Sequence, residues 1–90
     1  MVGQMATSRA GRDKDTLYVI VAHEGDFVYL CDGRLKPPER PKKKRLKHIQ
    51  PINGTVGEAL LRKLQGGEKV YAEEIRHELK LYAEGQSIDC

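Results

Sequence analysis

The sequence predicts a mainly β N-terminal part, residues 1–52, followed by a helical C-terminal part, residues 53–90. Three observations support this fold class. The run Leu17–Ala22 is apolar at both parities, as expected of a strand that is covered on both faces. Phe27–Cys31 resumes the apolar pattern after a polar interruption, which indicates a hairpin. After Pro51 the apolar spacing changes from two to between three and four, which indicates helices.

The other β elements follow from local composition. Val2–Ser8 is extended in character and leads into a polar loop, and Asp32-Gly33 is a turn dipeptide. Three prolines between Gly33 and Lys42 lack amide donors, so we expect an exposed loop there that carries a run of basic residues. Arg45–Ile49 is a candidate for one more short strand, with Leu46 pointing inward.

Two helices are expected in the C-terminal part. Thr55 and Glu58 have the spacing of a capping box, and an apolar stripe follows and stops at Gly66-Gly67. The second helix spans Tyr71–Ala83 and ends near Gly85. Its apolar face is formed by Tyr71, Ile75, Leu79 and Tyr82. We expect the two helices to pair or to cover one side of the strands, packed on or beside the β part.

Positive charge is concentrated in one segment, Arg34–His48. Between Arg34 and Ile52 eight lysines and arginines stand against the single acid Glu39, whereas acids outnumber lysines and arginines on both flanks. The net charge of +3 for the whole chain therefore understates the positive charge that a polyanion would meet at this segment. The basic residues of the segment are Arg34, Lys36, Arg40, Lys42, Lys43, Lys44, Arg45 and Lys47.

Other function classes receive little support. Ninety residues can fill only a modest core, and no histidine, serine and carboxylate spacing indicates a nucleophile with its base, so we expect no enzyme and no cofactor. The spacing of Cys31, Cys90, His23 and His48 matches no compact metal site. No apolar run is long enough to span a membrane, and two unpaired cysteines suit a reducing compartment, so we expect a cytoplasmic protein.

The N-terminal half resembles a known RNA-binding family. Val2–Lys14 followed by Leu17–Ala22 resembles the KOW motif, a strand, a basic loop around a glycine, and a strand. Asp32–Leu35 and Pro41–Gln50 are similar to the remainder of bacterial KOW-domain RNA-binding proteins, which are related to a large-subunit ribosomal protein family of archaea and eukaryotes. The resemblance covers roughly residues 2–50, a little over half of the chain.

The resemblance implies an SH3-like small β-barrel of KOW type with about five strands, followed here by two short helices. It also implies that the loop and neighbouring basic side chains contact RNA, with ribosomal RNA or the ribosome as the expected partner. Gly11 matches the motif glycine, and Arg9, Arg12 and Lys14 match the basic loop positions.

The glycine loop and the basic residues, considered by themselves, also favour contact with RNA. Gly11 can adopt a turn that lets the Arg12 guanidinium approach a phosphate, although an ordinary glycine turn is the alternative. Five cations in the six residues Lys42–Lys47 repel one another without an anionic partner. His48 is either one more RNA contact or a structural residue. Tyr18, Phe27 and Tyr29 are expected in the core, with recognition of the RNA backbone or shape as the main contribution.

We therefore expect an RNA-binding protein. The alternative is a protein-interaction adaptor that uses the barrel or the C-terminal helix face, which an exposed cluster of Tyr18, Phe27 and Tyr29 would favour. DNA binding ranks third, because neither expected helix combines a polar readout face with clustered arginines. The candidate RNA-binding residues are Arg9, Gly11, Arg12, Lys14, Arg34, Lys36, Arg40, Lys42, Lys43, Lys44, Arg45, Lys47 and His48.

Overall fold

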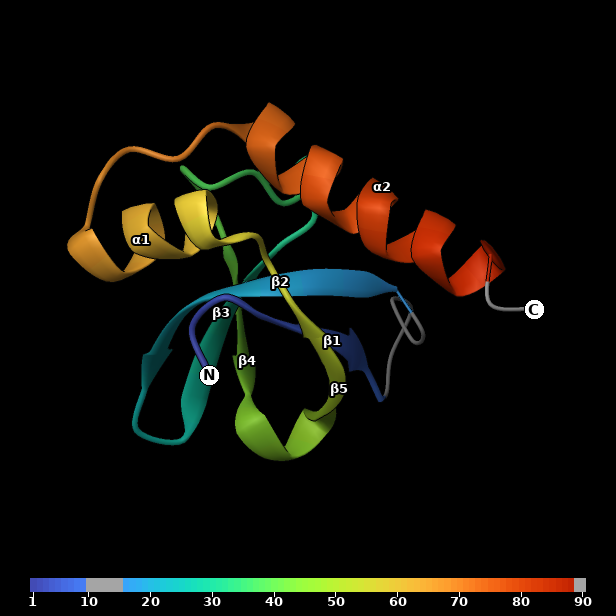
Figure 1. Ribbon diagram of the computed structural model, residues 1–90. Helices are drawn as coiled ribbons and strands as arrows, with labels where there is room; N and C mark the ends of the chain where they lie inside the picture. Colours follow the sequence, from blue (N-terminus) through green and yellow to red (C-terminus); the bar gives the residue numbers. More distant parts are fainter. Residues whose placement is uncertain (10–15, 89–90) are drawn as a thin grey trace.

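The β part is one five-stranded antiparallel sheet (Figure 1). The computed structural model describes residues 1–9 and 16–88. Four strands follow one another as neighbours, and the fifth returns beside the first, so the spatial order is β4-β3-β2-β1-β5. The strands are β1 (Gln4–Ser8), β2 (Leu17–Glu24), β3 (Phe27–Cys31), β4 (Lys42–Arg45) and β5 (Ile49–Thr55). A 3-10 helix, η1 (Leu46–His48), joins β4 to β5.

Two helices lie together on one side of this sheet, α1 (Glu58–Gly66) and α2 (Ala72–Ile88), as Figure 1 shows. An ion pair between Lys63 Nζ and Glu74 Oε2, 2.8 Å apart, joins them. The expectation of a small β domain followed by C-terminal helices is thus confirmed. No helix in the described residues is long and apolar enough to cross a membrane.

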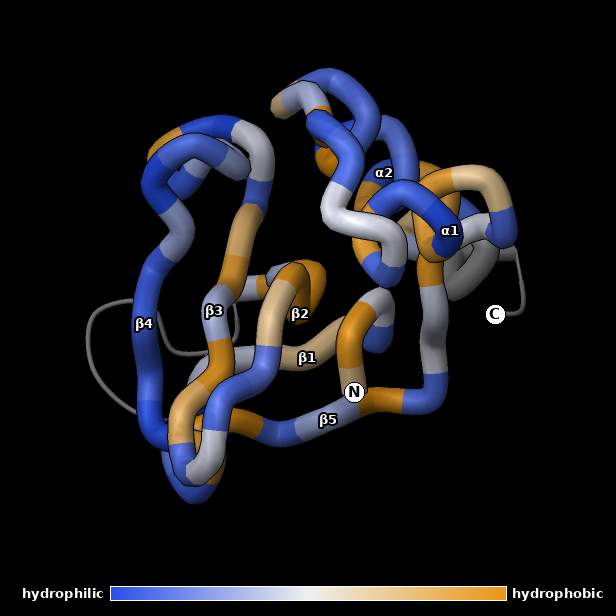
Figure 2. The backbone as a smooth tube through the Cα atoms, turned by 90° about the vertical axis from the view of Figure 1, so that its left-hand side faces the viewer, coloured by the Kyte–Doolittle hydropathy of each residue, from blue (hydrophilic) through white to orange (hydrophobic). Residues whose placement is uncertain are grey.

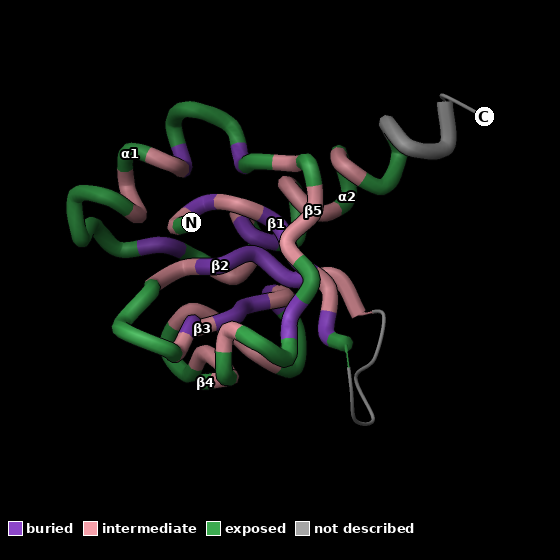
Figure 3. Tube along the Cα trace, turned by 90° about the horizontal axis from the view of Figure 1, so that it is seen from below, coloured by how far each residue is buried: buried purple, intermediate pink, exposed green. Residues whose placement is uncertain are grey.

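The two faces of the sheet support two hydrophobic clusters. Neighbouring residues of a strand point to opposite faces, so Met5 lies on one side and Ala6 on the other. The helix-side cluster packs Met5, Val19 and Cys31 of the sheet against Val56, Leu60, Val70 and Ile75. The opposite-face cluster consists of Ala6, Tyr18, Ile20, Val28, Leu30 and Ile49. Figure 3 shows the resulting buried stretches along β1, β2 and β3.

Contrary to the sequence prediction, the basic run does not lie wholly in an exposed loop. The exposed loop is confined to the proline-rich stretch, and the four cations Lys42–Arg45 form β4, which pairs with β3. A strand of cations is possible here because β4 is at the edge of the sheet, where a strand needs only one partner. The expected separate strand Arg45–Ile49 is also wrong, because Arg45 ends β4, η1 follows, and β5 begins only at Ile49. Leu46 is half-buried against the opposite-face cluster, as expected.

The start of α1 differs from the expected capping box. Thr55 is the last residue of β5, and α1 begins after Gly57, which has no side chain to act as a cap. The Gly57 N–H instead donates to Glu78 Oε1 of α2, 2.7 Å away. The carboxylate that accepts an N–H at the start of α1 thus comes from 21 residues further along the chain, and not from the nearby Glu58 as the sequence spacing predicts. The predicted C-terminal end at Gly66-Gly67 is confirmed, and Gly67 has a left-handed φ of 71°.

Helix α2 follows the predicted apolar stripe with two differences. Ile75 is fully buried, and Leu79 and Tyr82 pack against the helix-side cluster, so this face is intramolecular core. Tyr71 lies before the helix and is half exposed. The helix also continues through Gly85 to Ile88, because one glycine inside a helix costs only about 1 kcal/mol relative to alanine.

Candidate nucleic-acid interface

The KOW-like loop begins beside the end of the basic segment. Gly11, Arg12 and Lys14 lie outside the described residues, but Arg9 is described and exposed. Its backbone N–H donates to the carbonyl of His48, 2.9 Å away. His48 is itself exposed, at the end of η1. The structure therefore brings together two candidate residues that are 39 positions apart, Arg9 and His48.

A second contact ties the same corner of the sheet to β4. Lys44 Nζ donates to Ser8 Oγ at 2.6 Å, although β4 and β1 are separated by β3 and β2 in the sheet. Lys44 pairs with Val28 of the opposite-face cluster, and Ser8 is almost completely buried. A lysine side chain can span two intervening strands only where the sheet curls strongly, so β4 and β1 approach each other across the opposite face.

The four cations of β4 divide between the two faces. Lys42 and Lys44 are half-buried and lie on the opposite face, with Leu30 and Val28 as their partners. Lys43 and Arg45 are exposed and lie on the helix side. Figure 2 shows β4 as a continuous hydrophilic strand beside the apolar residues of β3. Only the second pair of cations is open to a large anionic partner.

The exposed pair surrounds an aromatic ring. Lys43 Nζ lies 4.4 Å and the Arg45 guanidinium carbon 5.1 Å from the centre of the Phe27 ring. Both distances allow a cation–π interaction, which holds the two side chains over β3 while they stay accessible to solvent. Phe27 itself is half-buried. Two exposed cations held side by side on β4 form a surface that phosphate groups can approach.

The remaining candidates are distributed along the connections. Arg34 and Lys36 belong to a tight turn in which Asp32 Oδ1 accepts both of their backbone N–H groups, at 2.8 and 2.9 Å. Arg40 is exposed in the proline-rich loop, where its N–H donates to the Pro37 carbonyl. Lys47 is exposed on η1. The basic segment is thus not one continuous patch, because its first residues lie at a different place from β4 and η1.

A cleft between the turn after β3 and α2 contains cationic residues that the sequence interpretation missed. Arg34 and Thr16 line it together with Arg76, His77 and Lys80 of α2, and Asp32 and Glu73 contribute acids. Arg76 Nη1 donates to the Gly33 carbonyl at 2.5 Å and thereby fixes the turn against the helix. Arg76 and Lys80 are four residues apart on a helix and therefore share a face. That spacing is the only signal in the sequence that places them together.

The aromatic residues do not form the exposed cluster that would favour an adaptor. Tyr18 is buried in the opposite-face cluster, as the sequence predicts. Phe27 and Tyr29 are only half-buried and lie on the helix side of the sheet, which is a different face. Their expected place in the core is therefore wrong in part, because the helix-side cluster covers Cys31 at one end of β3 but does not include Phe27 or Tyr29.

No family model and no curated protein matches the chain. The resemblance of residues 2–50 to the KOW motif therefore stays a prediction, and so does ribosomal RNA as the target.

Proposed function

We propose that this protein binds RNA, with the KOW-like loop, β4 and η1 as one surface. The observation that carries the proposal is the corner where Arg9 donates to His48 and Lys44 donates to Ser8. Two basic segments that are far apart in sequence meet there. A surface of this kind binds phosphates without reading bases, so it positions the protein on an RNA backbone.

The fold supports the same proposal. We propose that the sheet is an SH3-like small barrel of KOW type, because four strands form a meander, a 3-10 turn follows, and β5 returns beside β1. The Lys44–Ser8 contact across the opposite face supports a strongly curled sheet. In this arrangement the last residue of β1, Ser8, and η1, which precedes β5, lie at the same end of the sheet.

Binding would proceed mainly by counterion release. Arg9, Lys43, Arg45 and Lys47 are exposed and can each neutralise a phosphate, and the planar guanidinium groups can bind phosphate oxygens in pairs. Each neutralised phosphate contributes about −0.7 to −0.9 to the slope of log K against log salt. Four to five contacts therefore give a slope of roughly −3 to −4.5. By resemblance, the target is ribosomal RNA in the cytoplasm.

The first experiment compares three nucleic acids of equal length across a salt series. The purified protein is titrated with a ribosomal RNA fragment, a matched structured RNA and duplex DNA. Preference for one RNA that persists at physiological salt supports the proposal. Equal and steeply salt-dependent binding to all three would leave only a cationic surface, and the adaptor would become the better hypothesis.

A double variant then tests the surface itself. Lys43→Ala with Arg45→Ala removes the exposed cations of β4, so RNA affinity should fall and the salt slope should flatten by about 1.5. The matched control is Arg62→Ala with Lys80→Ala, which removes the same charge from exposed positions on α1 and α2, away from β4. Loss of affinity in the control equal to that in the β4 variant would contradict the proposed surface.

A further inference from the structure

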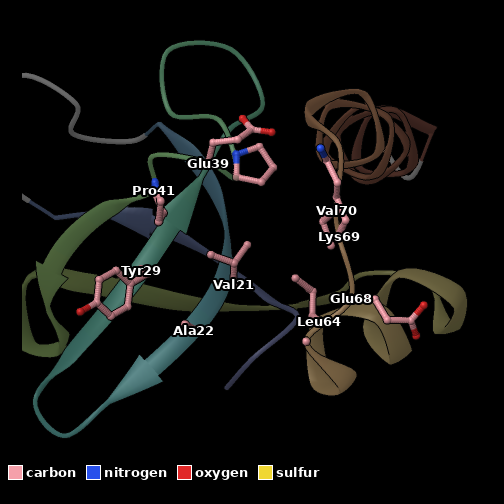
Figure 4. Close-up of a pocket in the computed structure, with 11 residues that line it drawn as sticks. Val21, Ala22, Tyr29, Glu39, Pro41, Leu64, Glu68, Lys69 and Val70 are labelled. Carbon is pink, nitrogen blue, oxygen red and sulfur yellow. The ribbon is translucent and has the colours of Figure 1, made fainter.

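A groove separates the helix side of the sheet from the proline-rich loop and the α1–α2 connection (Figure 4). Its volume of about 490 Å³ is within the range of small-molecule sites. Val21 and Tyr29 contribute from the sheet, Pro41 from the loop, and Leu64 and Val70 from the helical part. The lining is therefore mainly apolar, with one aromatic ring that the helices leave uncovered.

The exposed cations of β4 lie next to the aromatic side of the groove. Tyr29 pairs with Lys43 and Phe27 pairs with Arg45 in the β3–β4 register, so all four lie on the same face. The two aromatic side chains of β3 therefore lie beside the two cationic side chains of β4 at the edge of the sheet. Single-stranded nucleic acids are bound by such surfaces, in which rings stack on bases and cations follow the backbone.

Charge is unevenly distributed around the groove. Lys43 and Arg45 lie on its β4 side, whereas Glu39 and Glu68 line the other sides. Lys69, the cation of that rim, lies 5.2 Å from the centre of the Tyr71 ring. A polyanionic backbone is therefore attracted to the β4 side and repelled from the opposite rim. Carboxylates at the rim are hydrogen-bond acceptors, which suit the exocyclic amines of bases and not phosphates.

We propose that this groove receives an unpaired base of single-stranded RNA, which stacks on Tyr29 while the adjacent phosphates contact Lys43 and Arg45. The inference rests on the proposed function and adds the class of RNA. A base inside a duplex is already stacked and paired, so it cannot enter the groove. The protein would thus bind unpaired segments more tightly than helices. Stacking then contributes more than the small number of aromatic residues suggests.

The test uses a ten-nucleotide single-stranded RNA and the same strand annealed to its complement. Affinities are measured by fluorescence anisotropy at physiological salt for the unmodified protein and for Tyr29→Leu. The unmodified protein should prefer the single strand, and Tyr29→Leu should lose about five- to tenfold in affinity for it with no change for the duplex. The control Tyr71→Leu changes an exposed tyrosine that is not among the residues lining the groove, and it should bind both RNAs normally.

A second measurement does not depend on a variant. Methyl resonances of Val21, Leu64 and Val70 in the unmodified protein should shift when the single strand is added and stay in place with the duplex. Unchanged resonances, or normal single-strand binding by Tyr29→Leu, would overturn the groove proposal. If Lys43→Ala with Arg45→Ala still loses affinity in that case, the proposed RNA-binding surface stands. If the double variant also binds normally, both proposals fail.

Discussion

The Lys44 ammonium lies 2.6 Å from the hydroxyl of Ser8, a residue that is only 1 % exposed. This contact connects the first and fourth strands of the chain across the opposite face of the sheet. The contact distinguishes Lys44 from Lys43, which has the same side chain but is exposed on the other face of the sheet. The two lysines therefore serve different purposes, and their variants should behave differently.

Lys44→Ala should lower the free energy of unfolding by about 1–3 kcal/mol, because it removes a charged hydrogen bond and leaves a buried hydroxyl with one partner fewer. Lys43→Ala should change it by less than about 1 kcal/mol, since only an exposed cation–π contact is lost. Urea denaturation of both variants measures the difference. Equal losses would show that the Lys44–Ser8 contact contributes nothing specific.

Two glycines with positive φ offer a matched comparison. Gly33 has a φ of 76°, and an added Cβ would lie 2.5 Å from the Ala72 carbonyl oxygen of α2. Gly25 has a φ of 58° with open space around the same position. Gly25→Ala should therefore lower the free energy of unfolding by about 1–2 kcal/mol, because alanine disfavours a positive φ. Gly33→Ala should lower it clearly more, because α2 must also move. Thermal unfolding of the two variants checks the order, which a lower melting temperature for Gly25→Ala would contradict.

The start of α1 should depend on Glu78 and not on Thr55. Glu78→Ala removes the carboxylate that accepts the Gly57 N–H, so the free energy of unfolding should fall by about 1–2 kcal/mol. Thr55→Ala should have an effect of less than about 0.5 kcal/mol, because Thr55 is an exposed residue of β5. Chemical denaturation distinguishes the two. A larger loss from Thr55→Ala would restore the capping box.

Cys31 should be a nearly unreactive thiol in the folded protein. Burial, together with the smaller effect of the nearby acids Asp32 and Glu39, raises its pKa from 9.0 to about 12. In a Cys90→Ser background, labelling of Cys31 with a thiol reagent at pH 8 should be slower than in urea by about a thousandfold, from the thiolate fraction alone. Rapid labelling of the folded protein would show that the helix-side cluster opens readily.

The same pKa shift determines how stability depends on pH. The folded state keeps the Cys31 proton between pH 9 and pH 12, while the unfolded state loses it. The contribution of this thiol is therefore fully present below pH 9 and is lost as the pH rises toward 12, by at most about 1.4 kcal/mol per pH unit. Denaturation of the Cys90→Ser protein and of Cys31→Ala in the same background measures this term by difference.

The sequence predicted the elements whose periodicity is strong. Leu17–Ala22 and Phe27–Cys31 became adjacent strands, and the stripe of Ile75, Leu79 and Tyr82 became core, because apolar spacing reports which side of an element is buried. Prediction was wrong at Lys42–Arg45, where composition favours a loop and the backbone pairing of an edge strand decides the outcome. Local pattern could not identify Glu78, since its partner Gly57 lies on another element.

For the candidate site too, the sequence predicted one part and could not predict another. Composition alone located the basic segment, but it could not show that Lys42 and Lys44 face one side while Lys43 and Arg45 face the other. That assignment depends on the register with β3, which a run of identical charges does not specify. The groove beside Tyr29 could not be predicted from the sequence either, because its lining residues come from the sheet, the proline-rich loop and the helical part.

The position of β4 at the end of the strand order has a consequence for self-association. An outermost strand presents unpaired backbone groups on which a second copy of the chain can add its own strand. Here four consecutive cations occupy that strand, and Pro51 interrupts the donors of β5 at the other end. Two copies would have to bring eight positive charges together to join through β4. A bound polyanion would neutralise this repulsion, so the residues that we propose to contact RNA would also keep free molecules apart.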